Sequence, residues 1–95
     1  MLIIAGKAVV APEERDRYVE MHKDLTRRSR SAPGCRDAAI TADPLEPGRV
    51  NVFELWDSEE HLTAWRAVAN APEDAPAMLG DDVQKFQISS LGPPF

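Results

Sequence analysis

The spacing of apolar residues changes several times along the chain, and each change predicts a new element. Three short apolar segments have the alternating or β-branched pattern that is typical of strands: Leu2–Val10, Cys35–Ala42 and Arg49–Trp56. The range 82–91 predicts a last strand with Phe86 and Ile88 on one face, and residues 92–95 form a tail.

A long helix is predicted from Pro12 to Ala32. Proline and the acidic residues that follow it suit the first turn of a helix, and Pro33 with Gly34 ends it. Four residues share one face at helical spacing and should point toward the core: Tyr18, Met21, His22 and Leu25.

A second helix should follow the third strand. Asp57 is the predicted N-cap, and Glu60 completes a capping box. The helix should reach Asn70, with Leu62 and Trp65 on its inner face. Two prolines then predict one or two short helical turns within residues 70–81.

The predicted order is β-α-β-β-α-β in a single domain, residues 1–95. This order is typical of an α+β, ferredoxin-like fold with a four-stranded antiparallel sheet and both helices on one face. The other face would leave apolar strand residues exposed to water. Pairing of two copies through this open sheet face would cover them, so we expect a homodimer.

Composition narrows the possible partners and location. The chain of 95 residues has 11 Lys+Arg and 16 Asp+Glu, a net charge of −5, which argues against nucleic-acid binding. No segment approaches the ~18 apolar residues that a membrane-spanning helix needs. The N-terminal residues lack the pattern of a signal peptide, and Cys35 has no second cysteine with which to form a disulfide, so a cytoplasmic protein is expected.

The sequence lacks a phosphate-binding glycine loop, a nucleophile elbow and the paired cysteines of a metal site. We therefore expect no metal. The two histidines, His22 and His61, fall on different predicted helices.

One stretch resembles a known family. The segment 49–65, RVNVFELWDSEEHLTAW, is an apolar strand ending in Glu-x-Trp, followed by acidic residues and a helix with a leucine. This pattern resembles the core signature of the antibiotic biosynthesis monooxygenase superfamily, and the resemblance extends from about Leu2 to Ile88. It implies a ferredoxin-like domain that pairs into a dimeric α+β barrel. It also implies oxygenation of polycyclic anthrones or quinols without metal or flavin, so no cofactor is expected.

The chain departs from the family at one position. Many members carry a histidine where this chain has Trp65, while a haem-degrading branch has tryptophan there. That branch needs an iron-ligating histidine about ten residues further on, and residues 70–76 contain none. Its first-strand asparagine would correspond to Lys7. Haem degradation is therefore disfavoured.

The candidate site combines one base, one polar group and several rings. His22 is the candidate base, because a pKa near neutrality suits deprotonation of an acidic phenol. Asn51 would orient the substrate if its strand face meets the helices, or would lie in an interface if that face meets a partner. The candidate substrate-binding residues are Trp56, Trp65, His61 and Tyr18.

Structural roles are the alternative at each position. Trp65 and His22 lie on inward stripes, where core packing is the common role. Glu54 is costly in a central strand unless a partner such as an arginine pairs with it, and otherwise would be a desolvated base.

The leading hypothesis is a cofactor-independent monooxygenase that oxidises a planar aromatic or quinol-type molecule with O2. A non-catalytic binding or structural dimer is one alternative, and an isomerase-like protein with a small polar pocket is the other. A cavity of ~300 Å³ or more, lined by both histidines and Trp65, would favour a ligand site.

Overall fold

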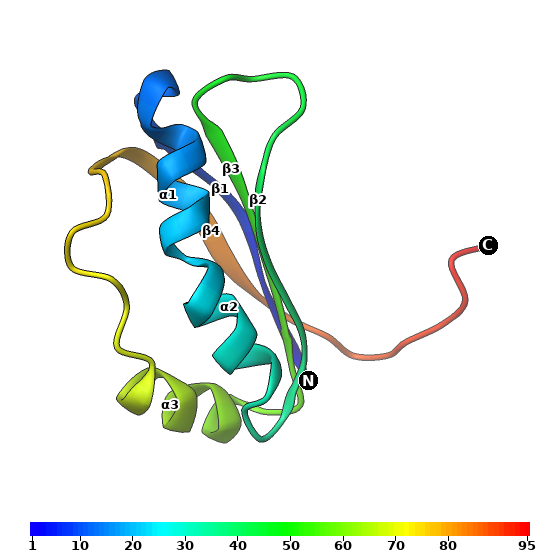
Figure 1. Ribbon diagram of the computed structural model, residues 1–95. Helices are drawn as coiled ribbons and strands as arrows, with labels where there is room; N and C mark the ends of the chain where they lie inside the picture. The colour runs from blue at the N-terminus through cyan, green and yellow to red at the C-terminus, as the bar shows by residue number, and fades with distance from the viewer.

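The protein consists of one sheet layer and one helical layer, as the order of elements predicted (Figure 1). The computed structural model describes residues 1–95. The strands are β1 (Leu2–Val10), β2 (Cys35–Ala42), β3 (Arg49–Trp56) and β4 (Met78–Gln87). The helices are the short 3-10 helix η1 (Pro12–Glu14), α1 (Arg15–Met21), α2 (Lys23–Arg30) and α3 (Glu59–Val68).

The sheet is antiparallel with the order β2-β3-β1-β4, which places β1 and β3 in its centre. Leu2 pairs with Trp56, and Ala8 pairs with Val50. Because paired residues point to the same face, the even-numbered residues of β1 and β3 form one continuous surface. This surface faces the helices, and the predicted ferredoxin-like fold is confirmed.

The core lies between this surface and the helices, in two clusters. Leu2, Ile4, Trp56 and Leu62 form the cluster under α3, with Trp65 packed against them. The second cluster lies under α1 and consists of Ala8, Val10 and Val50, with Tyr18, Val19 and Ile40 against it.

The first helical segment is broken at His22, so the prediction of one helix from Pro12 to Ala32 is wrong. His22 has φ −92° and ψ 2° and separates α1 from α2. Its ring Nδ1 lies 2.7 Å from the Tyr18 carbonyl oxygen, the acceptor that its own backbone N–H would use in a regular helix. The backbone N–H instead lies closer to the Val19 oxygen, at 3.1 Å against 3.3 Å for Tyr18. Competition from the side chain therefore disturbs the helix.

The predicted boundaries of α3 and of the last strand are also corrected. The N-cap of α3 is Ser58 rather than Asp57, and its hydroxyl accepts a hydrogen bond from the His61 N–H; α3 ends at Val68, before the predicted Asn70. The last strand covers 78–87 instead of 82–91, and residues 70–77 contain a turn at 73–74 but no helix. Since β4 pairs with β1 along nearly the whole of that strand, from Gln87 opposite Leu2 to Met78 opposite Val10, β1 sets its limits.

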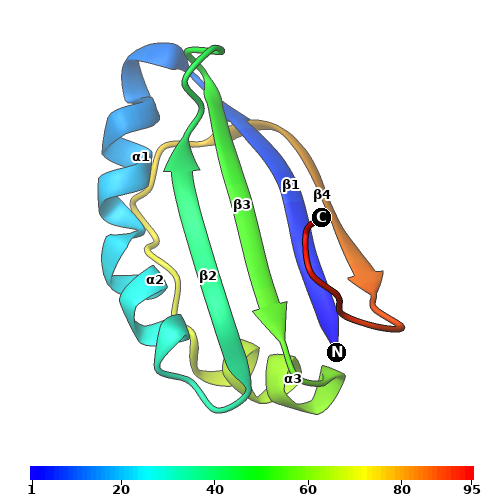
Figure 2. The same ribbon diagram turned by 90° about the vertical axis from the view of Figure 1, so that its right-hand side faces the viewer.

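The second face of the sheet carries no helix. Figure 2 looks onto this face, where the C-terminal segment runs in front of the strands. Phe86 pairs with Ile3 on this side and is 49% exposed. We call this surface the open face. No helix of the protein combines the length and the apolar character needed to span a membrane.

Leu62→Ala tests the core under α3. The side chain is 1% exposed, so its truncation should lower the free energy of unfolding by about 2–5 kcal/mol. Leu45 is 87% exposed, and Leu45→Ala should change the free energy of unfolding by about 0.5 kcal/mol or less. Urea unfolding of both variants checks this, and equal effects would contradict the assignment of Leu62 to the core.

Candidate functional site

Trp65 of α3 is partly buried against the core cluster between α3 and the sheet. It borders a cavity of about 40 Å³, which we call the inner cavity. The inner cavity is lined by residues of α2, β2 and β3 besides Trp65, among them Leu25, Thr26, Ser29, Ala38, Ile40 and Glu54. Trp65 also borders a second cavity of about 100 Å³, together with His61, Ala64 and Val68. Trp65 therefore lines two small spaces.

Two contacts hold the Trp65 ring in place. The ring centroids of Trp56 and Trp65 are 6.4 Å apart at an interplanar angle of 27°. The Arg28 guanidinium carbon also lies 5.7 Å from the Trp65 ring centroid, a cation–π distance. Arg28 also donates to the Ala69 carbonyl oxygen at 2.7 Å and to Asp24 at 2.9 Å, so it ties α2 to the end of α3.

Glu54 is the ionisable residue that lines the inner cavity. The Trp56 indole Nε1 donates to its Oε1 at 2.9 Å. The partner is therefore a tryptophan two residues further on rather than an arginine. Glu54 is half-buried, and this bond fixes the rotamers of both side chains.

His22 is 8% exposed, and its ring stacks on Tyr18 with centroids 4.2 Å apart. Because the Tyr18 carbonyl can only accept, Nδ1 must carry the ring hydrogen in this contact. In the neutral ring the lone pair is then on Nε2, where a base needs it. His22 lines none of the cavities. It lies at the junction of α1 and α2, one turn before Leu25 and Thr26, which line the inner cavity.

Tyr18 lies beyond His22, away from Trp65, against the second core cluster. Burial raises the pKa of its phenol, and the charge of Asp81 raises it further. Tyr18 therefore stays neutral and packs against His22.

His61 is positioned by two local features. Its Nδ1 lies 2.7 Å from the Ser58 hydroxyl, which also accepts from the His61 backbone N–H. The ring lies directly over Gly34, where φ is +81° and a β-carbon would collide with the imidazole. Glycine is needed there both for the backbone conformation and for the space.

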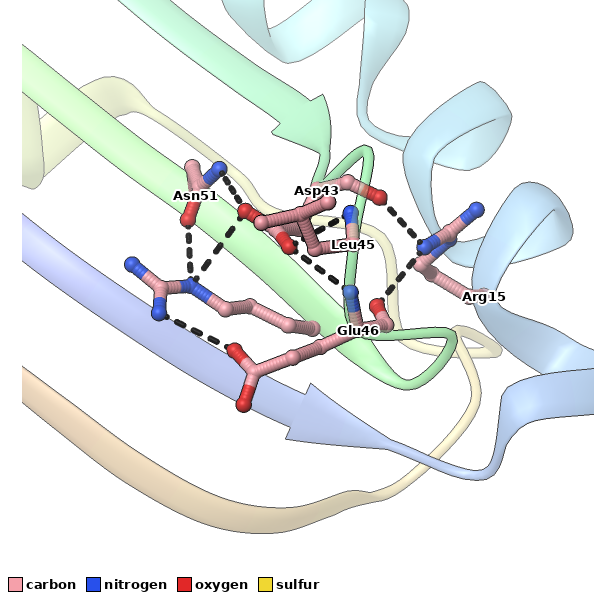
Figure 3. A network of polar contacts seen from close by, with 6 residues as sticks. Arg15, Asp43, Leu45, Glu46 and Asn51 are labelled. Atoms are coloured by element: carbon pink, nitrogen blue, oxygen red, sulfur yellow. Dashed lines mark hydrogen bonds and ion pairs between the residues drawn. The ribbon is translucent and has the colours of Figure 1, made fainter.

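Asn51 does not belong to this group. Residue 51 lies on the open face, where its Oδ1 accepts from Arg49 at 2.7 Å and its Nδ2 donates to Asp43 at 3.0 Å (Figure 3). Asp43 also accepts from the backbone N–H groups of Leu45 and Glu46, at 3.0 and 2.8 Å. Of the two roles left open for Asn51, the structure places it on the face without helices.

Arg15 of α1 joins the same loop from the helical side. Its guanidinium donates to the carbonyl oxygens of Asp43 and Glu46, at 2.9 and 3.0 Å (Figure 3). The β2–β3 loop is therefore held from both layers.

The structure thus brings Trp56, Trp65 and His61 together, places His22 and Tyr18 at the next turn, and separates Asn51. Leu25, predicted on the inward stripe, lines the inner cavity, whereas sequence reasoning overlooked the cavity-lining residues Thr26 and Ser29. Their spacing from His22, i+4 and i+7, is the signal that could have found them. Burial raises the pKa of the Cys35 thiol, and the charge of Glu54 raises it further, so this cysteine is not an activated nucleophile. No group of three or more His, Cys, Asp or Glu side chains is arranged to hold a metal ion.

Comparison with known families gives a match over residues 1–71 to the model described as antibiotic biosynthesis monooxygenase. An uncharacterized protein of Synechocystis is 26% identical over 61 residues. The match covers 64% of this chain but only 42% of that protein, so the chain spans about two fifths of the relative's length.

Solved structures share the fold at low identity. A candidate antibiotic biosynthesis monooxygenase from Nitrosomonas europaea has a TM-score of 0.73 and 15% identity, over 95% of this chain and all of that one. A similar candidate from Deinococcus radiodurans has a TM-score of 0.70 and 13% identity, over 100% of this chain and 99% of that one. A possible oxidoreductase of unknown function from Bacteroides thetaiotaomicron has a TM-score of 0.71 and 18% identity, over 92% of this chain and 96% of that one. These likenesses show a common fold.

The Asp43 cluster predicts a pH effect. The Asn51 side chain, the Glu46 and Leu45 N–H groups and the charge of Arg49 lower the pKa of Asp43 from 3.8 to about 2. Since the folded-state pKa is the lower one, this stabilisation is complete above pH 3.8 and is lost as the pH falls toward 2. Carboxyl-carbon NMR should show Asp43 titrating near pH 2, and Asn51→Ala should raise that midpoint. An unchanged midpoint in the variant would contradict the assigned cause.

Proposed function

The chain belongs to the antibiotic biosynthesis monooxygenase family, and on that premise we propose that it is a monooxygenase acting on a planar aromatic or quinol-type substrate. We further propose that dioxygen is the oxidant and that neither metal nor flavin takes part. The family match supports the reaction class. The surroundings of Trp65 support the substrate class.

The position of Trp65 is the observation that carries this proposal. Trp65 lines both the inner cavity and the second cavity, and its ring contacts Trp56 and Arg28. Neither cavity reaches the ~300 Å³ expected of a ligand pocket, and they do not bring the two histidines together. A substrate ring therefore has to displace Trp65 and stack against it, which joins the two spaces. Stacking of this kind favours flat aromatic molecules.

The proposed reaction begins with loss of a proton from the substrate. A base forms a phenolate or carbanion, which passes one electron to O2, and the two radicals then combine. The resulting hydroperoxide loses water, so that one oxygen atom enters the product and the substrate loses two hydrogens. The protein contributes orientation and a dry environment around the anion.

His22 is the proposed base, supported by its Nδ1 bond to the Tyr18 carbonyl, which leaves the lone pair on Nε2. Glu54 is the second candidate, because it lines the inner cavity directly. Its Oε1 is occupied by the Trp56 indole, while its second oxygen has no partner in the chain.

We also propose that two copies pair through the open face. Exposed Phe86 and Val9 lie there, and burial of such apolar surface favours association. Dimers are common in this family.

A non-catalytic binding or structural dimer is the second candidate function. The observation in its favour is the small size of the two cavities, about 40 and 100 Å³. It predicts that Trp65 stays in place and that no substrate is consumed. An isomerase of a small polar metabolite would instead turn over without oxygen.

Oxygen uptake by metal-free protein with anthrones and hydroquinones tests the proposal. The wild type should consume O2 and give a product heavier by one oxygen and lighter by two hydrogens. His22→Asn keeps a donor to the Tyr18 carbonyl but removes the basic nitrogen, so turnover should fall about 100-fold or more.

Glu54→Gln is the matched control, since its amide oxygen still accepts from Trp56. If Glu54→Gln abolishes uptake and His22→Asn does not, Glu54 is the base. No uptake by the wild type with any substrate would overturn the oxygenase proposal.

Phe86→Lys tests the dimer. A buried charge in each half of the interface should shift the molecular mass measured by light scattering from two chains to one. Val68→Lys is the control, because Val68 is 67% exposed on the helical side and should leave the dimer intact. A Phe86→Lys variant that remains dimeric would place the interface elsewhere.

A further inference from the structure

A basic groove runs between α2 and the β2 edge of the sheet. It is lined by Lys23, Arg27 and Arg30, by the hydroxyls of Thr26 and Ser31, and by Ile40, and its volume is about 460 Å³. No carboxylate is among these lining residues, although the whole chain has a net charge of −5. The groove is therefore a local positive site on an acidic protein.

The acidic partners of these cations lie at the edges of the groove and hold them weakly. The distances are 3.9 Å for Lys23–Glu20, 3.4 Å for Arg27–Asp24 and 3.8 Å for Arg30–Asp37. The three basic side chains are 56–66% exposed. Pairs this exposed contribute little, so the cations stay available to a ligand. Arg30 is positioned by donating to the Ala38 carbonyl oxygen at 2.7 Å.

The basic groove adjoins the inner cavity. Thr26 and Ile40 line both spaces, so these two side chains form the wall between them. An aromatic ring in the inner cavity therefore has the three cations within reach of a substituent on its outer edge.

The opposite side of α2 has a different character. A groove of about 500 Å³ there is lined by Met21, Asp24, Leu25, Arg28 and Val68, among others. Its one arginine is already bound by Asp24 and by the Ala69 carbonyl. Only the β2 side of α2 offers cations without a carboxylate in the lining.

We propose that the ligand of the inner cavity is a planar aromatic anion, a carboxylate or an acidic phenolate, which enters through the basic groove. The anionic group lies among Lys23, Arg27 and Arg30, and the ring passes Thr26 and Ile40 toward Trp65. This inference rests on the proposed function and specifies its substrate class. A positive groove on an acidic surface also concentrates anions at this entrance.

Calorimetric titration with a matched pair of probes tests this inference without requiring turnover. The probes are 2-naphthoate and the uncharged 2-naphthalenemethanol, each titrated at low and at high salt. The variant Lys23→Gln/Arg27→Gln removes two cations and leaves the Arg30 bond to β2 in place. The control Arg17→Gln/Arg66→Gln removes two exposed cations outside the groove.

The wild type should bind naphthoate more tightly than the alcohol, and high salt should reduce this preference. The groove variant should weaken naphthoate binding about tenfold, as expected from two exposed charge contacts, and leave the alcohol unchanged. The control variant should change either affinity by less than about twofold.

Three results would overturn the inference: no naphthoate binding by the wild type, equal affinity for both probes, or equal losses in the groove and control variants. Naphthoate binding as expected, without oxygen uptake by any substrate, would refute the oxygenase and leave the anion site standing. Oxygen uptake at equal rates for charged and uncharged quinols would refute the anion site and leave the oxygenase proposal standing.

Discussion

Successive side chains of a strand point to opposite faces of the sheet, and this alternation in β1 and β3 determines which residues can act together. Leu2, Ile4 and Trp56 are buried under the helices because they are even-numbered neighbours in that register. Glu54 follows the same rule and reaches the inner cavity, whereas Asn51 is placed on the open face. A shift of one residue in the pairing of β3 would exchange these two sets.

Much of the fold follows from local pattern, and the rest depends on contacts that pattern does not contain. β1, β2 and β3 have their predicted limits because turn residues bound them. The limits of β4 are set by pairing with β1, and the break at His22 by a side chain that competes for a backbone carbonyl. Alternation also predicts that Asn51 and Glu54 face opposite sides, but only packing decides which side the helices cover.

The same packing relates the candidate site to the surface. Trp65 contacts both Trp56 and Arg28, and the two spaces that it lines are too small for an aromatic ligand while it stays there. Displacement of Trp65 therefore costs the contacts of its indole ring. A flat ligand can replace these contacts by stacking on the ring. The basic groove beside α2 is separated from this space by Thr26 and Ile40, so recognition of the ring and of an attached anionic group occurs at adjacent positions.

The central claim is that a planar ligand displaces and contacts Trp65 while the rest of the core stays fixed. The chain has two tryptophans, so a proton–nitrogen NMR spectrum contains two indole N–H signals. Titration with a planar hydroquinone under anaerobic conditions should shift the Trp65 signal. The Trp56 signal should move less, because its N–H remains bonded to Glu54 and only its stacking contact with Trp65 changes. If neither signal moves while the ligand is in large excess, the space around Trp65 is ordinary core and the account is wrong.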